Sequence, residues 1–459
     1  VSGLVNDSVI PFVDVTFQLS DGNLQYQEYL ALTQLSLSGK ATNGEQKSNE
    51  TTSLDISSLS FHTAASKFEL SGKIQNPDKI EYQLKSVIDL DLQEIMPFVP
   101  DSLVKSLNGK MLAEISTSGT LPDSISEEFI YKALAKTQAT FQLSNVNANL
   151  DDTLKVNGLN LRMNYWPDKI ELSNFSAEIP TYNLEIKDLN TSINGKLTTP
   201  DSLHLKIGGF NASIPTYNLD VKKLVAELNG NITKPESLDI KVDSLIAESG
   251  TSKIDLTGKI KNPMAPDYSV KGRINLNLDE IKNFVPDTLV NSMSGNIGAS
   301  FQSAAKINLD SITEQMYDWA FGKSSFDLNL DNVTVNMPDS TMSIANLSGQ
   351  LNYKSDSLYI QQLQANYLGL QFGINSVSVA NLYSAALQNQ AKELRVHGNF
   401  SIDDLDYAIV EKLMQEDSTA TPDSDAEPMK FTYKITGNFK ANSLKYEDAL
   451  FKNVNSKFL

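Results

Sequence analysis

The chain has 459 residues, no cysteine, and an excess of 18 acidic over basic side chains. Without cysteine it can form neither disulfides nor thiolate metal sites. An acidic chain without a basic run would repel a phosphate backbone, so we expect no nucleic-acid partner. No stretch approaches the ~18 consecutive apolar residues of a membrane-spanning helix.

Apolar and polar residues alternate with period two through most of the chain, and this pattern predicts half-buried β-strands. It begins with Val13, Val15 and Phe17 and is still present at residues 431–439. Sequences typical of turns, such as Asn-Gly and Asn-Pro, separate the alternating segments. We therefore expect a mainly β protein with antiparallel strands.

Short amphipathic segments interrupt the strands and predict a few peripheral helices that cover sheet edges or ends. The predicted helices span residues 93–98, 124–136, 279–284, 311–322, 380–392 and 403–415. Residues 415–429 are acidic and contain proline but have no apolar period. We expect that segment to be a disordered loop.

The sequence contains two duplications. Ile179-Pro-Thr-Tyr-Asn-Leu recurs at Ile214, an offset of 35 residues, and about half of the following positions are identical. Residues 66–109 match residues 252–295 at a constant offset of 186 residues. Repetition at fixed offsets is typical of repeat folds, and each 35-residue copy should be an antiparallel hairpin or part of a meander.

The larger duplication suggests how the chain is organised. We expect an N-terminal part of the repeat at residues 1–65, a first large repeat unit at 66–251 and a second at 252–414. The acidic loop at 415–429 and continuing β-strands at 430–459 would follow. Because these last strands end within the repeating pattern, we expect the chain to be a piece of a longer protein.

Glycine recurs in the sequence apolar-x-Gly-x-apolar from one end of the chain to the other, for example at Gly72, Gly258, Gly349 and Gly437. Period two places each glycine on the same strand face as its apolar neighbours. Glycine in a strand marks a bend, a bulge or a close approach. The missing side chains could let a long sheet curl, or could clear space for an acyl chain.

Three segments carry a resemblance to a known family: the repeated run at 70–101 and 256–287, VHGNFSIDDLDY at 396–407, and ITGNFKANSLKYEDALFKNVNSKF at 435–458. They resemble the AsmA-like family of bacterial envelope proteins, which are relatives of TamB in the repeating β-groove lipid-transfer class. The resemblance covers most of the chain. It implies a long, curled, taco-like β-sheet with an apolar groove, exposed to the periplasm and anchored to the inner membrane by an N-terminal helix outside this chain.

The resemblance also implies a function. Such a protein would bind and transfer phospholipid without catalysis and contribute to outer-membrane lipid homeostasis. Membrane lipids would be its partners, with other envelope proteins as further candidates at the ends of the groove. From the period-two pattern, the candidate groove residues are Leu203, Leu205, Ile207, Leu238, Ile240, Val242, Leu256 and Ile260.

We find no motif for catalysis, a cofactor or a metal. The histidines His62, His204 and His397 lie far apart on strand-like runs, and no Gly-x-Ser-x-Gly sequence is present. We therefore expect no enzymatic activity, no cofactor and no metal. Two alternatives to lipid transfer stay open: a structural or adhesive β-repeat with a closed core, and an envelope-biogenesis adaptor for outer-membrane protein assembly.

Overall fold

The computed structural model describes residues 11–26, 30–100, 102–122, 124–150, 154–195, 203–231, 233–307, 309, 318–338, 343–367, 370–408 and 429–458. The chain divides into two compact units, and each is described by itself. Unit 1 comprises residues 1–216 and 220–234, and unit 2 comprises residues 217–219 and 235–459.

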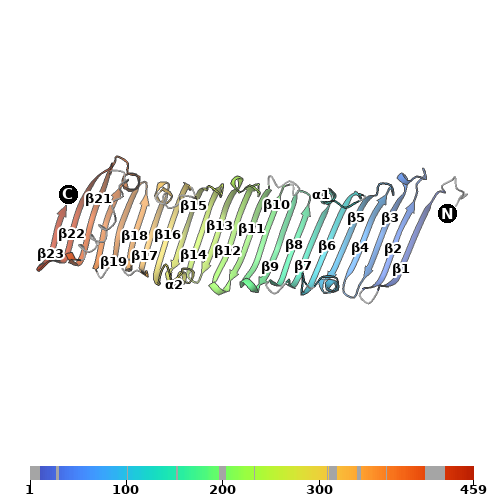
Figure 1. The fold of residues 1–459 in the computed structure, drawn as a ribbon, viewed down its shortest axis with the longest axis horizontal. Coiled ribbons are helices and arrows are strands. Elements are labelled where there is room, and N and C mark those ends of the chain that lie inside the picture. The colour runs from blue at the N-terminus through green and yellow to red at the C-terminus, as the bar shows by residue number, and fades with distance from the viewer. Residues whose placement is uncertain are drawn as a thin grey trace. The chain divides into compact units, whose positions relative to one another are not determined.

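Strands dominate both units, as the alternating pattern predicts, and they follow one another in chain order (Figure 1). The strands of the first half are β1 (Asp14–Tyr26), β2 (Leu30–Thr42), β3 (Ser53–His62), β4 (Lys67–Gln75), β5 (Glu81–Asp91), β6 (Ser106–Thr120), β7 (Gln138–Asn149), β8 (Lys155–Trp166), β9 (Lys169–Ile179), β10 (Leu184–Asn194), β11 (Leu203–Ile214) and β12 (Leu219–Gly230). Unit 2 continues with β13 (Asp239–Ser249), β14 (Ser252–Lys261), β15 (Asp267–Asn277), β16 (Ser292–Lys306), β17 (Ser325–Asn336), β18 (Ile344–Lys354), β19 (Ser357–Tyr367), β20 (Leu370–Ala380), β21 (Glu393–Asp406), β22 (Thr432–Tyr446) and β23 (Ala449–Phe458).

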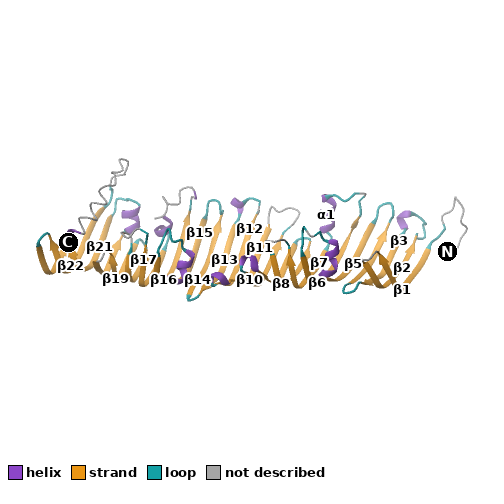
Figure 2. Ribbon diagram, turned by 60° about the horizontal axis from the view of Figure 1, so that its bottom comes forward, coloured by secondary structure: helices purple, strands orange, loops and turns teal. Residues whose placement is uncertain are grey.

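The helices are short and lie at strand ends, where Figure 2 draws them in purple. They are η1 (Asn49–Thr51), η2 (Leu92–Phe98), α1 (Glu127–Leu134), η3 (Pro180–Tyr182), η5 (Pro215–Tyr217), η6 (Pro235–Ser237), α2 (Leu278–Ile281), η7 (Lys282–Phe284), η9 (Asp318–Gly322) and η11 (Leu382–Leu387). The predicted helices at 93–98, 124–136, 279–284 and 380–392 are confirmed in part or whole. The one at 311–322 is described only from residue 318, where η9 begins, and residues 415–428 of the predicted disordered loop lie outside the described residues.

The predicted helix at 403–415 is wrong over its first four residues. Asp403 to Asp406 belong to β21, which runs parallel to β22 with Asp404 opposite Ser443 and Asp406 opposite Lys445. Ser443 Oγ donates to Asp404 Oδ1 at 2.5 Å, and Lys445 Nζ lies 3.1 Å from Asp406 Oδ2. These donors come from a strand distant in sequence, so local periodicity could not reveal them.

The strand pairs observed among the described residues join strands that follow one another along the chain. All of them except β21–β22 are antiparallel. No such pair closes either sheet on itself. The parallel pair requires a long crossover, which the chain between Asp406 and Thr432 provides. Each unit is therefore an open sheet.

Cross-strand register gathers the apolar residues on one face of each sheet. One row across unit 1 contains Leu19, Leu37, Leu59, Leu70, Ser86, Ile115, Ala139, Tyr165, Ile170, Ile193 and Leu205. One row across unit 2 contains Ala247, Ile254, Ile274, Ala299, Leu328, Leu351, Ile360 and Val377. The opposite face of unit 2 is polar, with a row of Lys253, Asn275, Gly298, Asn329, Gln350, Gln362, Asn375, Asn399, Asn438 and Lys457.

β-Bulges interrupt many of these strand pairs and shift their register. In β6 a bulge lies at Gly109, and in β16 one lies at Gly295, the equivalent position under the 186-residue duplication. Both glycines have positive φ angles, +115° and +95°. A Cβ at Gly295 would lie 2.4 Å from the carbonyl oxygen of Asn332, so only glycine fits. Because bulges bend strands and increase their twist, they explain the predicted curl.

Asparagines in the left-handed conformation accompany several bulges. They are Asn145, Asn174, Asn332 and Asn346, with φ between 50° and 55°. Asparagine tolerates this conformation better than most residues. The N–H of Asn145 donates to Asn160 Oδ1 and that of Asn332 to Ser348 Oγ, both at 2.9 Å. The N–H groups of Asn174 and Asn346 likewise donate to Asn190 Oδ1 and Thr334 Oγ1, so a side chain of a neighbouring strand accepts the hydrogen bond at each of these bulges.

The recurrent strand glycines let neighbouring backbones approach closely. A Cβ at Gly72 would lie 2.1 Å from the carbonyl oxygen of Gln83, and one at Gly349 would lie 2.0 Å from that of Gln362. The adjacent strand therefore occupies the space that the missing side chains leave. This favours curling of the sheet over space for an acyl chain as the role of these glycines.

Candidate functional site

The candidate site is the apolar face of each unit, and the first tandem copy contributes to it in unit 1. Leu203 begins β11, and Leu205 and Ile207 follow it on the same face. Leu205 is the cross-strand partner of Ile193, and Ile207 that of Thr191. All three predicted residues are half-buried.

In unit 2 the remaining predicted residues lie around β13 and β14. Leu238 directly precedes β13, and Ile240 on that strand is the cross-strand partner of Ile260. Val242 is opposite Gly258, and Leu256 is opposite Leu245. Most of these side chains are half-buried, while Ile260 is 37% exposed. The register thus brings the predicted residues of this unit onto one face.

Neither apolar face is sealed in the part of the chain that the structure describes. Tyr353, at 1% exposure, is the only large side chain there that is fully buried. Few of the described apolar residues are buried. Most of those that are buried are alanine or valine, for example Ala113, Ala139, Val146, Ala177 and Val333. The closed core of a protein of 459 residues would bury many large side chains. The apolar rows are therefore available to a ligand.

Short helices border the apolar face of unit 1 at both ends of β6. At the start of that strand, η2 covers a hollow of about 500 Å³. The hollow is lined mainly by apolar side chains, among them Phe61, Phe68, Ile88, Leu90, Ile95 and Phe98. At the other end, α1 accepts a hydrogen bond of 3.0 Å from Tyr165 Oη at the carbonyl of Leu134. Both helices were predicted from the sequence, but the hollow was not.

A glutamate in each large repeat fastens the connecting helix to a strand hairpin. In unit 2, Glu280 of α2 accepts hydrogen bonds from the N–H of Thr251 at 2.9 Å and from Ser252 Oγ at 2.7 Å. These bonds, chiefly the one from the Thr251 backbone, lower the pKa of Glu280. Ser252 Oγ also accepts the N–H of Asn277 at 2.9 Å.

The first copy repeats this arrangement at the equivalent positions. Glu94 of η2 accepts hydrogen bonds from Ala65 N–H at 2.8 Å and from Ser66 Oγ. Partial burial alone would raise the pKa of Glu94, but the bonds from Ser66, Thr63 and Ala65 together lower it. Ser66 Oγ accepts the N–H of Asp91 at 2.9 Å. The two copies therefore share their side-chain contacts as well as their strands.

In unit 2 an aromatic cluster covers part of the apolar face near η9. Tyr353 packs against Phe321 and Phe326, with ring centroids 5.1 and 5.4 Å away, and its hydroxyl donates to the carbonyl of Phe321 at 3.0 Å. Burial, with a contribution from Asp356, raises the pKa of Tyr353 to about 12. Phe321 of η9 thus covers Phe326 and Tyr353 on this part of the apolar face.

Searches against family models, curated proteins and solved structures found no match to this chain. The described helices include none that is long and apolar enough to cross a membrane. Within the described residues, no three His, Cys, Asp or Glu side chains come together in a way that could hold a metal ion. His397 Nδ1 lies 2.9 Å from Thr436 Oγ1, and His204 pairs with Asn229.

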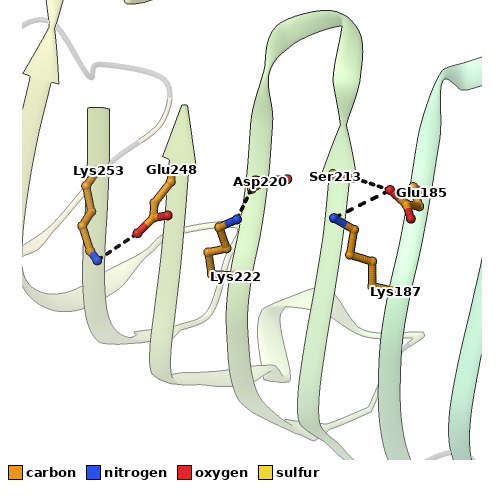
Figure 3. Close-up of polar contacts among 7 residues, drawn as sticks. All are labelled: Glu185, Lys187, Ser213, Asp220, Lys222, Glu248 and Lys253. Carbon is orange, nitrogen blue, oxygen red and sulfur yellow. Dashed lines mark hydrogen bonds and ion pairs between the residues drawn. The ribbon is translucent and has the colours of Figure 1, made fainter. Parts of the chain in front are cut away.

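The opposite face carries exposed ion pairs and hydrogen bonds, several of which appear in Figure 3. Lys222 Nζ lies 2.6 Å from Asp220 Oδ2 in unit 1, and Lys253 Nζ lies 2.9 Å from Glu248 Oε1 in unit 2. Exposed pairs of this kind contribute ~0–1 kcal/mol each. Their main effect is to keep this face hydrated, which distinguishes it from the apolar face.

Exposed apolar residues on the connectors at strand ends were not predicted as part of the site. Phe98 and Leu103 are 62% and 64% exposed, and their equivalents Phe284 and Leu289 are 43% and 62% exposed. The signal was present in the sequence, because both pairs occur in the repeated run Phe-Val-Pro-Asp-x-Leu. Their exposure follows from where the connectors lie, which sequence alone does not give.

Proposed function

We propose that the apolar faces bind the acyl chains of phospholipids and that the protein transfers lipid without catalysis. One observation carries this proposal: each unit has rows of half-buried apolar side chains, and in the described part of the chain only short helices cover parts of them. A soluble sheet normally buries such a face by closing, by packing on a second sheet, or by lining a groove. Here a ligand of low polarity would complete the burial.

The energetics favour an acyl chain as that ligand. Taking a ~16-carbon chain from a bilayer into water costs ~12 kcal/mol, at about 0.8 kcal/mol per CH₂. A continuous apolar row removes most of that cost, and the row through Leu205 in unit 1 runs from β1 to β11. The hollow under η2 offers a further apolar surface of the kind that holds a chain end.

The resemblance to AsmA-like envelope proteins supports a place in the periplasm and a role in outer-membrane lipid homeostasis. Exposed aromatic residues on the connectors, Phe98 and Phe284, are suited to contact with a lipid surface or a protein partner. The rival with a closed structural core is disfavoured because the described residues bury so few large side chains. The adaptor role in outer-membrane protein assembly remains an alternative that partner capture would test.

An aspartate placed on the apolar face tests the proposal. We expect Leu205→Asp combined with Ile240→Asp to abolish lipid co-purification with little change in thermal melting, because an open face leaves the new carboxylates in contact with water. In a sealed core each unpaired charge would cost several kcal/mol and unfold its surroundings.

Lys206→Asp is the matched control, since Lys206 lies next to Leu205 with its side chain on the polar face. It should retain lipid and lower the melting temperature only slightly, because it removes one partly exposed ion pair, in which Lys206 Nζ lies 3.7 Å from Glu227 Oε1. Loss of folding in the double variant would favour the closed repeat. Unchanged lipid content in a folded double variant would contradict the assignment of the apolar face as the binding surface.

A further inference from the structure

Four lysines come together on the polar face of unit 2, although they are far apart in the sequence. Lys241, Lys259 and Lys271 lie on β13, β14 and β15, and Lys323 follows η9. They line one hollow of about 580 Å³, in which Asp243 is the one carboxylate among the described lining residues. Lysine is charged near neutral pH. The hollow is therefore positive in a chain whose net charge is −18.

Two of these lysines are placed against each other. Lys241 is the direct cross-strand partner of Lys259, and like charges at opposed positions destabilise a sheet. The first copy differs at this point. Under the 186-residue offset the equivalent pair is Asp55 opposite Lys73, which is a favourable combination. Cross-strand pairing alone would favour the Asp–Lys combination, so the Lys–Lys pair in the second copy concentrates positive charge that sheet pairing does not require.

Most of the positive charge in the hollow is uncompensated. Lys241 Nζ lies 2.7 Å from Asp243 Oδ1, and both side chains are partly exposed. For Lys259, Lys271 and Lys323, no ion pair with a carboxylate is found among the residues that the structure describes.

Hydroxyl groups complete the lining of the hollow. Thr257 and Ser269 lie on β14 and β15 and line the hollow beside the lysines. Hydroxyl and ammonium groups are hydrogen-bond donors to anionic oxygens. The hollow therefore combines several charged donors with neutral ones, as an oxyanion requires.

We propose that this hollow binds a phosphate group. Phosphate is compact, carries at least one negative charge and offers several acceptor oxygens, which matches three uncompensated ammonium groups. A nucleic acid would need basic side chains well beyond the hollow and would be repelled by the acidic chain as a whole. The inference is independent of the proposed lipid function, because the lysines lie on the face opposite the apolar row. The phosphate could belong to a phospholipid headgroup or be free in solution.

Calorimetric titration of the full chain with inorganic phosphate at low ionic strength tests the proposal. We expect one phosphate to bind and to bind more weakly as salt is added. The double variant Lys259→Gln and Lys271→Gln should bind at least about tenfold more weakly, equivalent to ~1.4 kcal/mol. Lys73→Gln with Lys85→Gln, at the equivalent positions of the first copy, should bind as the unaltered chain does.

The absence of phosphate binding to the unaltered chain would overturn the proposal. Equal binding by both double variants would mean an adventitious ion only and would also overturn it. Thermal melting in phosphate-free buffer supplies the folding control. Removing Lys259 relieves its like-charge repulsion with Lys241. The melting temperature of the Lys259→Gln and Lys271→Gln double variant should therefore match or exceed that of the unaltered chain. A clear decrease would contradict the proposal.

Vesicles distinguish the two sources of phosphate. Phosphatidylcholine vesicles containing phosphatidic acid should compete with inorganic phosphate if the ligand is a lipid headgroup. Without competition, the phosphate bound in the hollow is the free ion. The single variant Leu205→Asp, which lies outside the lining of the hollow, should bind inorganic phosphate normally, so failure of the lipid proposal and failure of this one give different results.

Discussion

Substitution of Gly295 by alanine tests how the bulges shape the sheet. With φ at +95°, an alanine would adopt an unfavourable backbone conformation that costs ~1–2 kcal/mol. Its Cβ would lie 2.4 Å from the carbonyl oxygen and 2.6 Å from the carbonyl carbon of Asn332. These are backbone atoms, so β17 must shift, at a typical cost of ~1–3 kcal/mol. Reduced freedom of the unfolded chain returns ~0.4–1 kcal/mol.

The expected net destabilisation is therefore ~1–5 kcal/mol. Gly298→Ala on the same strand is the control, because its Cβ would meet only the side chains of Asn275 at 3.3 Å and Asn329 at 3.9 Å. We expect that variant to change stability by less than ~1 kcal/mol. Gly109→Ala should reproduce the Gly295 result in the first copy.

Hydrogen exchange is the suitable assay, because repeat arrays couple mainly to their nearest neighbours and global unfolding need not be two-state. Faster exchange should appear in β16 and β17 of Gly295→Ala and decline toward more distant strands. If Gly295→Ala and Gly298→Ala show the same exchange rates in β16 and β17, the reasoning about the bulge is refuted.

Two further predictions concern the α2 connector. Leu278 is 4% exposed, so Leu278→Ala should destabilise α2 and the neighbouring strands β15 and β16 by ~2–5 kcal/mol, as measured by hydrogen exchange, and a change under ~0.5 kcal/mol would contradict its packing role. Hydrogen bonds lower the pKa of Glu280 below its ordinary 4.5, so its stabilising effect is present above pH 4.5 and is lost as the pH falls through the folded-state pKa. Glu280→Gln should therefore lower the thermal midpoint at pH 7 and weaken its dependence on pH in the acidic range, and an unchanged midpoint at pH 7 would count against the contact.

Much of the fold could be predicted from the sequence because its causes are local. Period-two alternation gives the strands, and the face on which Leu205 and Ile240 lie follows directly from that alternation. The repeated offset also gives the equivalence of Gly72 and Gly258, which face Leu84 and Val270 at corresponding register positions.

Other features depend on contacts between distant residues. The bulge at Asn145 needs Asn160 on the next strand to accept its N–H, and no local pattern states that register. The apolar residues near Asp404 and Asp406 recur at helical spacing, which predicted a helix. Pairing with β22 instead keeps both aspartates in an extended strand. The lysine hollow could not be predicted either, because its four lysines form no run in the sequence: strand pairing brings three of them together, and the connection after η9 adds Lys323.

Native mass spectrometry of the purified chain tests the central claim most directly. If the apolar faces bind acyl chains, the spectrum of the chain expressed in bacteria and purified without detergent should contain adducts whose masses match phospholipids. Those adducts should disappear in Leu205→Asp with Ile240→Asp and persist in Lys206→Asp. A spectrum of the unaltered, folded chain with no lipid adduct, even after incubation with phospholipid vesicles, would contradict the account.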